Sequence, residues 1–164
     1  MALTVLTLLG CNSSDLDDSA KREMKPAAAE LLEVWKSGNQ EAAIDLFLKT
    51  DWTSATLFPE ESVLRFTEKE YIKRANQTTL GQELITASGQ LKQVARAVAD
   101  EGTRLGASGD LEAAQAHFQA LRSCGQALNQ EHYTKLLQLV GQAFTMMAEK
   151  CEAHIAQFSE HQLE

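Results

Sequence analysis

The sequence predicts an all-α protein built from antiparallel helical hairpins, and three observations support this. One stretch occurs twice: residues 37–47 read SGNQEAAIDLF, and residues 108–118 read SGDLEAAQAHF. Apolar side chains recur at spacings of three and four residues along most of the chain, as amphipathic helices require. The composition is rich in Ala, Leu, Gln and Glu and low in Gly and Pro, which favours helices over a turn-rich β sandwich.

Each copy of the repeated stretch has the features of a corner between two helices. Gly38 and Gly109 can take the left-handed backbone conformation that ends one helix. Asn39 and Asp110 can then cap the exposed N–H groups at the start of the next helix. The alanines that follow allow a neighbouring helix to come close, and the final Phe can fill the groove between helices. Each copy therefore predicts a pair of antiparallel helices whose alanine-bearing sides meet.

Length and charge limit the classes of protein to which this chain can belong. Its 164 residues suit a single domain, and a hydrophobic content of 44% is enough to build a core. The 23 acidic and 15 basic residues give a formal net charge of −8. Most of such a surface would repel a phosphate backbone, so we expect no nucleic-acid partner.

The N-terminus differs in composition from the rest of the chain. Residues 1–11 are apolar apart from two threonines and end at Cys11, whereas residues 12–23 are polar and acidic and predict a flexible tether. The sequence Leu-Leu-Gly-Cys that ends the first segment resembles the lipobox of a bacterial lipoprotein leader. This resemblance implies that Cys11 is lipidated and anchors the protein in the membrane. Asn12 after the cysteine implies an outer-membrane location facing the periplasm. The alternative is a cytoplasmic protein with an incidental N-terminal cysteine.

The helical domain is expected over residues 24–158, and it begins with a hairpin around Gly38. Apolar side chains recur at helical spacing before this glycine, and Trp35 is the last of them. Asn39 then caps a second short helix that has one apolar face.

Residues 51–66 interrupt the helical pattern, but they are too apolar for a free loop. Phe58 precedes a proline, and a residue in that position avoids the helical conformation. We expect an ordered connector that lies over the first hairpin and places Trp52 and Phe58 against it.

Thr67 and Glu70 have the spacing of a capping box, which predicts a short helix through Ala75. The polar residues 76–79 that follow are expected to form the next turn.

Three longer helical segments complete the predicted domain. The first ends near Gly106, and a narrow stripe of apolar and small side chains runs along it. Asp110 caps the second, and the third follows Asn129 and extends to residue 158. The polar residues 159–164 are expected to fray. The apolar members of the three stripes are Leu84, Leu91, Val98, Leu105, Ala114, Phe118, Leu121, Leu128, Leu136, Val140, Phe144, Met147, Cys151, Ile155 and Phe158.

The repeated corner resembles the turn of a tetratricopeptide repeat. The Gly-Asn/Asp turn is followed by the small residue of the second helix, Ala43 or Ala114, and by its aromatic residue, Phe47 or Phe118. The two corners are separated by about twice the roughly 34-residue period of that family. The resemblance implies a concave surface that binds protein and performs no chemistry. A simple helical bundle is the alternative architecture.

We interpret the chain as a non-enzymatic scaffold or adaptor that binds another protein at the cell envelope. The expected contact surface is the groove between the first hairpin and the long helix, with Trp35, Trp52 and Phe58. Met146 is a further candidate because methionines adapt to partner helices. The alternative is a small-molecule-binding or sensory bundle, and an enclosed apolar pocket near Trp52 would favour it.

No motif for catalysis or cofactor binding is present: the sequence lacks a nucleophile elbow, a phosphate loop and a dinucleotide fingerprint. We therefore expect no enzymatic activity and no cofactor. Cys151, His154 and His161 share a helical face, but no CxxC or HExxH pattern accompanies them, so we expect no metal site. Cys124 and Cys151 lie on apolar stripes too far apart along a helical pair to form a disulfide, and buried free thiols are expected.

Overall fold

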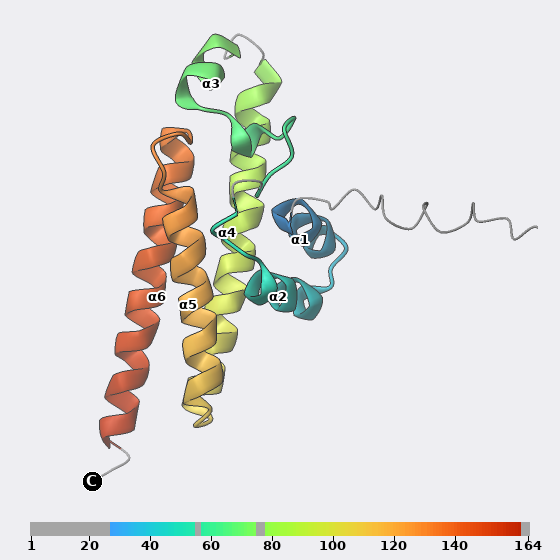
Figure 1. Cartoon of the computed structure of the whole chain (residues 1–164). Coiled ribbons are helices and arrows are strands. Elements are labelled where there is room, and N and C mark those ends of the chain that lie inside the picture. The colour runs from blue at the N-terminus through green and yellow to red at the C-terminus, as the bar shows by residue number, and fades with distance from the viewer. Residues whose placement is uncertain (1–26, 55–56, 75–77, 162–164) are drawn as a thin grey trace, which may run out of the picture.

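The computed structural model describes residues 27–54, 57–74 and 78–161, so the leader and tether expected over residues 1–23 lie outside the described residues. Within these ranges the chain is all-α, as predicted, and no residue is in a strand (Figure 1). The helices are α1 (Ala27–Lys36), α2 (Gln40–Lys49), α3 (Glu68–Arg74), α4 (Thr78–Ala107), α5 (Leu111–Leu128) and α6 (Lys135–His161), and a 3-10 turn lies at Val63–Arg65.

Helices α4, α5 and α6 run side by side in alternating directions and form the long axis of the molecule (Figure 1). The predicted stripes face one another in this bundle, and Leu91, Val98, Phe118 and Phe144 are fully buried. Each such side chain contributes about 1.5–3 kcal/mol by leaving water. Shared burial between the three helices therefore stabilises this part of the fold.

Helices α5 and α6 come into close backbone contact where two glycines meet. A Cβ atom on Gly125 would lie 2.6 Å from Gly141 O, and one on Gly141 would lie 2.5 Å from Gly125 O. Real Cβ atoms do not approach a carbonyl oxygen this closely, so neither position accepts a side chain unless the helices separate. Farther along the pair, Arg122 of α5 forms an ion pair with Glu152 of α6.

Helices α1 and α2 form the predicted first hairpin, which packs against the side of α4 (Figure 1). Both repeated corners have the expected geometry. Gly38 has φ +85° and Gly109 has φ +93°. The Asn39 side chain accepts a hydrogen bond from Ala42 N (3.2 Å), and the Asp110 side chain accepts one from Ala113 N (3.1 Å). These bonds satisfy N–H groups that have no partner within their own helix.

The helices that flank the two corners differ in length. Helices α1 and α2 have 10 residues each, whereas α4 has 30 and α5 has 18. The two corners therefore do not join units of equal size, and the resemblance to tetratricopeptide repeats stays a prediction.

The connector after α2 lies against the first hairpin, as expected. Trp52 Nε1 donates a hydrogen bond to Phe47 O (3.1 Å), and the centroids of the Trp52 and Phe47 rings are 4.7 Å apart. Ala28 N donates to Leu57 O (3.3 Å), which ties the connector to the start of α1. Phe58 meets Tyr133 edge to face at 6.2 Å, so the connector also contacts the chain just before α6.

Helix α3 begins with the predicted capping box. Glu70 N donates to Thr67 Oγ1 (3.2 Å), and Thr67 N donates to a carboxylate oxygen of Glu70 (2.9 Å). The first residue of α3, Glu68, also accepts a hydrogen bond from Lys135 N (2.8 Å) at the start of α6. A short helix in the middle of the chain thus helps to cap the last helix.

Two boundaries differ from the prediction. Helix α4 already includes residues 78 and 79, which were assigned to a turn, and α6 continues to His161, beyond residue 158. Both extensions consist of polar residues. Polar side chains do not indicate from sequence alone where a helix begins or ends.

Candidate binding surfaces

The expected contact surface between the first hairpin and the long helix is only partly present. Trp52 and Phe58 are 4% and 2% exposed. Both side chains are core residues that hold the connector in place, so little of either is open to a protein partner, and the small exposed part of Trp52 borders a recess described below.

The other two predicted contact residues remain accessible. Trp35 is half-buried at the end of α1, and its Nε1 donates a hydrogen bond to Gln93 Oε1 of α4 (3.2 Å). This bond holds the indole against α4. Met146 on α6 is 54% exposed. The two residues therefore lie on different helices: Trp35 packs against α4, whereas Met146 is open to solvent.

Met146 belongs to a row of exposed side chains, which we call the outer stripe of α6. Leu139 is 60% exposed, and the alanines at 143 and 153 and Lys150 are exposed as well. Members of the stripe follow one another at spacings of four, three, four and three residues, which is the spacing of a coiled-coil seam. In Figure 1, α6 borders the bundle on the side away from α1 and α2. The stripe is composed of Leu139, Ala143, Met146, Lys150 and Ala153.

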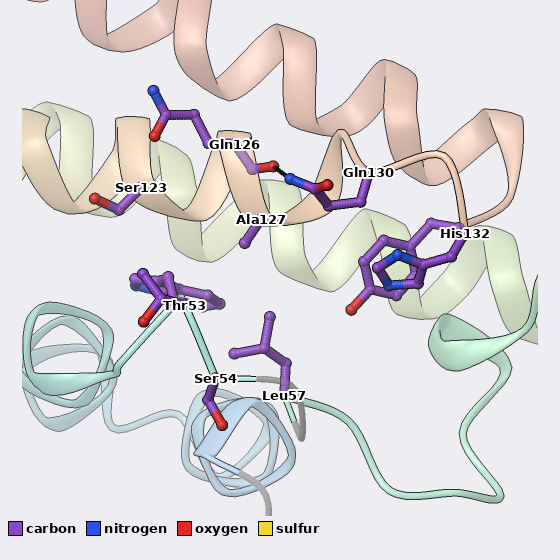
Figure 2. Close-up of a pocket in the computed structure, with 10 residues that line it drawn as sticks. Thr53, Ser54, Leu57, Ser123, Gln126, Ala127, Gln130 and His132 are labelled. Carbon is purple, nitrogen blue, oxygen red and sulfur yellow. Dashed lines mark hydrogen bonds between the residues drawn. The ribbon is translucent and has the colours of Figure 1, made fainter.

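A recess of about 490 Å³ lies between the connector and the C-terminal half of α5, and we call it the connector recess (Figure 2). Its volume is within the range of small-molecule sites. In Figure 2, Leu57 of the connector and Ala127 of α5 point toward each other across it. Its lining residues are Trp52, Thr53, Ser54, Leu57, Ser123, Gln126, Ala127, Gln130, His132 and Tyr133.

The lining of the recess has hydrogen-bonding groups but no Asp, Glu, Lys or Arg. Gln130 Nε2 donates a hydrogen bond to Gln126 O (3.0 Å), which holds the Gln130 carboxamide at the rim (Figure 2). The rings of His132 and Tyr133 are 4.1 Å apart. Burial raises the pKa of Tyr133, so its hydroxyl keeps its proton at neutral pH.

The described residues include two cysteines, Cys124 on α5 and Cys151 on α6. Cys124 and Cys151 are free thiols, as expected. Cys124 is buried, and this raises its pKa well above the ordinary value, which makes it a poor nucleophile. Cys151 is only half-buried, whereas the sequence predicted a buried thiol. The described residues include no group of three or more His, Cys, Asp or Glu side chains arranged to hold a metal ion.

His117 is buried between α4 and α5, and its Nδ1 lies 2.7 Å from Ala113 O. The contact places this nitrogen at hydrogen-bond distance from the preceding turn of the same helix, so the ring is part of the packing.

Among the described helices, none is both long enough and apolar enough to cross a membrane.

Two sets of surface residues were not predicted from the sequence. Leu139 and the exposed alanines of α6 have a detectable signal, because their heptad spacing continues through Met146. The recess has a weaker signal: Ser123 and Gln126 are polar residues on one face of α5, and Gln130 follows the C-cap of that helix. Nothing in the sequence indicates that the connector lies opposite that face.

Comparison of the chain with protein-family models, with curated proteins and with solved structures gives no match. The outer stripe and the connector recess are the two features of the described residues that indicate binding.

Proposed function

We propose that this chain is a non-enzymatic helical adaptor that binds an amphipathic helix of another protein through the outer stripe of α6. The observation that carries the proposal is the run of exposed side chains at coiled-coil spacing. Single exposed apolar residues are common on protein surfaces, but a row at this spacing matches the seam that a second helix would cover.

The composition of the stripe suggests what the partner helix presents. Leu139 and Met146 offer large apolar side chains two turns apart, and the alanines at 143 and 153 leave room for bulky residues opposite them. Methionine fits partner side chains of various shapes because it is unbranched and flexible. Lys150 occupies a seam position, where a charged residue sets register and partner choice. The best partner is therefore an apolar helix with an acidic residue facing Lys150.

The location of this adaptor is part of the same proposal. If Cys11 is lipidated, the chain is held at the bacterial envelope by its N-terminus, and α6 is free to meet a partner there. The experiment is membrane fractionation of the full-length chain and of its Cys11→Ser variant. Loss of membrane association in the variant supports the anchor, identical membrane association of the two proteins contradicts it, and recovery of both in the soluble cytoplasmic fraction assigns the protein to the cytoplasm.

Photo-crosslinking in cells that produce the protein tests the binding surface. A benzophenone amino acid is placed at Leu139 or Met146, and at Arg96 on the exposed side of α4 as a matched control. We expect a discrete covalent complex from the first two positions and none from the third. Mass spectrometry of the attached peptide is expected to show an apolar helical segment that contains an acidic residue.

A second substitution makes this test specific. Lys150→Glu places like charges together in the seam, and we expect roughly a tenfold loss of the complex from Met146. A complex that persists unchanged in Lys150→Glu, or that forms equally from Arg96, contradicts the proposal. A covalent dimer of this chain would assign the stripe to self-association and would also contradict the adaptor function.

A further inference from the structure

We infer that the connector recess is a second binding site, separate from the outer stripe, and that it takes a small, uncharged, flat heteroaromatic molecule with amide-like hydrogen-bonding groups. The site joins the connector after α2, the C-terminal half of α5 and the turn before α6. Binding at the recess requires neither the partner helix of the outer stripe nor anchorage at a membrane.

Apolar groups on opposite sides give the recess its preference for a flat ligand. Trp52 and Leu57 line it on the connector side, and Ala127 lines it from α5 (Figure 2). Tyr133 and His132 add aromatic surface from the turn before α6. A planar ring between such groups buries both faces, and stacking on an aromatic side chain adds to this gain.

The polar groups of the recess suit amides and ring nitrogens. The carboxamides of Gln126 and Gln130 each carry a donor and an acceptor, which is the pattern that a second amide matches. Ser123 adds a hydroxyl from one turn earlier on α5. On the connector, Thr53 N and Oγ1 both donate hydrogen bonds to Asp51 Oδ1 (3.0 and 2.6 Å), which fixes the Thr53 side of the rim.

Charge complementarity determines that the ligand is neutral. The lining includes no Asp, Glu, Lys or Arg, and the nearby Asp51 carboxylate oxygen Oδ1 is engaged by Thr53, so an ion in the recess would lose water without direct contact to a side chain of fixed opposite charge. The net charge of −8 adds a general repulsion against anions. An uncharged molecule avoids both costs, and the volume of about 490 Å³ leaves room for one or two fused rings.

Three ring compounds of similar size test the inference: nicotinamide as the neutral probe, nicotinate as the anion and 1-methylnicotinamide as the cation. Each is titrated into the labelled full-length protein, and amide shifts are followed by NMR. We expect nicotinamide to shift the resonances of the lining residues with a Kd on the order of millimolar, since so small a ligand has few atoms to contribute. Both charged compounds are expected to bind at least about tenfold more weakly.

Two variants connect that binding to the recess. Ala127→Met fills the space opposite Leu57 and is expected to abolish the shifts, whereas Ala116→Met on the exposed face of α5 leaves them intact. Gln126→Leu keeps the shape of an exposed side chain and is expected to weaken binding about fivefold by removing hydrogen bonds. Thermal unfolding of each variant shows that it is folded.

The inference is overturned if nicotinamide leaves the lining residues unshifted, if the three compounds bind equally, or if neither Ala127→Met nor Gln126→Leu weakens binding. Leu139→Gln on α6 separates this result from the adaptor proposal. It is expected to disrupt the outer stripe and to leave the nicotinamide titration unchanged, so either site can fail without the other.

Discussion

The first corner, at Gly38 and Asn39, and the second, at Gly109 and Asp110, have the same backbone conformation and the same cap in different surroundings. The first joins two helices of 10 residues at the side of the bundle. The second joins helices of 30 and 18 residues that cover each other along the bundle axis. A corner therefore specifies how the chain turns, while the length of each helix follows from the partners available along it, since most helix stability in proteins comes from packing.

Substitution of the equivalent phenylalanines of the two corners should cause the largest losses of folding free energy. It should also show whether the hairpin and the bundle unfold separately. Phe47 and Phe118 are both fully buried, so replacement by Ala is expected to cost about 3–5 kcal/mol at either site. Phe118→Ala should speed amide hydrogen exchange throughout α4, α5 and α6, because its ring lies inside the bundle. Phe47→Ala should speed exchange first in α1, α2 and the connector. Equal acceleration in α6 by both variants would show that hairpin and bundle unfold as one unit.

Substitution of the corner glycines tests whether the two turns are equivalent. Gly38 and Gly109 have positive φ angles, and a Cβ at either position meets no other atom within 4 Å. The cost of Gly→Ala is therefore conformational alone, about 1–2 kcal/mol at each corner. Gly89 in α4 is the matched control, because its Cβ would also meet no atom within 4 Å and its backbone is helical. Gly89→Ala is expected to stabilise the protein by about 0.5–1 kcal/mol in denaturant unfolding. Opposite signs at the two corners would contradict their equivalence.

The smallest expected effect on stability comes from the cap of α3. This cap differs from both corners because the Glu70 carboxylate accepts a hydrogen bond from Thr67 while Thr67 Oγ1 accepts one from Glu70 N. Hydrogen bonds from Thr67 lower the pKa of Glu70. A lowered folded-state pKa stabilises the protein above the unfolded-state pKa, and this contribution is lost as the pH falls through the ordinary glutamate pKa and then the folded one. NMR titration should show this shift for Glu70, and Thr67→Val should remove only the part due to the hydroxyl, because the backbone N–H of Thr67, which is the larger cause, is kept in the variant. A Glu70 pKa at the ordinary value in the unmodified protein would contradict the cap.

Local signals in the sequence predicted the corners, the capping box and most members of the buried stripes correctly. Each depends on residues a few positions apart, such as Thr67 and Glu70, or on one helical face. The apolar connector also predicted that Trp52 and Phe58 pack inward, but the contact of Phe58 with Tyr133 could not be predicted from local signals. Their burial depends on Phe47 and on Tyr133, which contact them across a turn and across the molecule. The connector recess was missed for a similar reason, because its two sides come from segments far apart in the chain.

The sequence by itself determined where the chain turns and how its helices begin, because left-handed glycines and capping side chains act through bonds to residues three or four positions away. Only the tertiary structure decided which apolar side chains are covered. The close contact of Gly125 and Gly141 fixes how α6 lies on α5 and leaves Leu139 and Met146 on the outer side. Burial is a property of neighbours in space, and a helix that is apolar on two faces can turn only one of them toward the core.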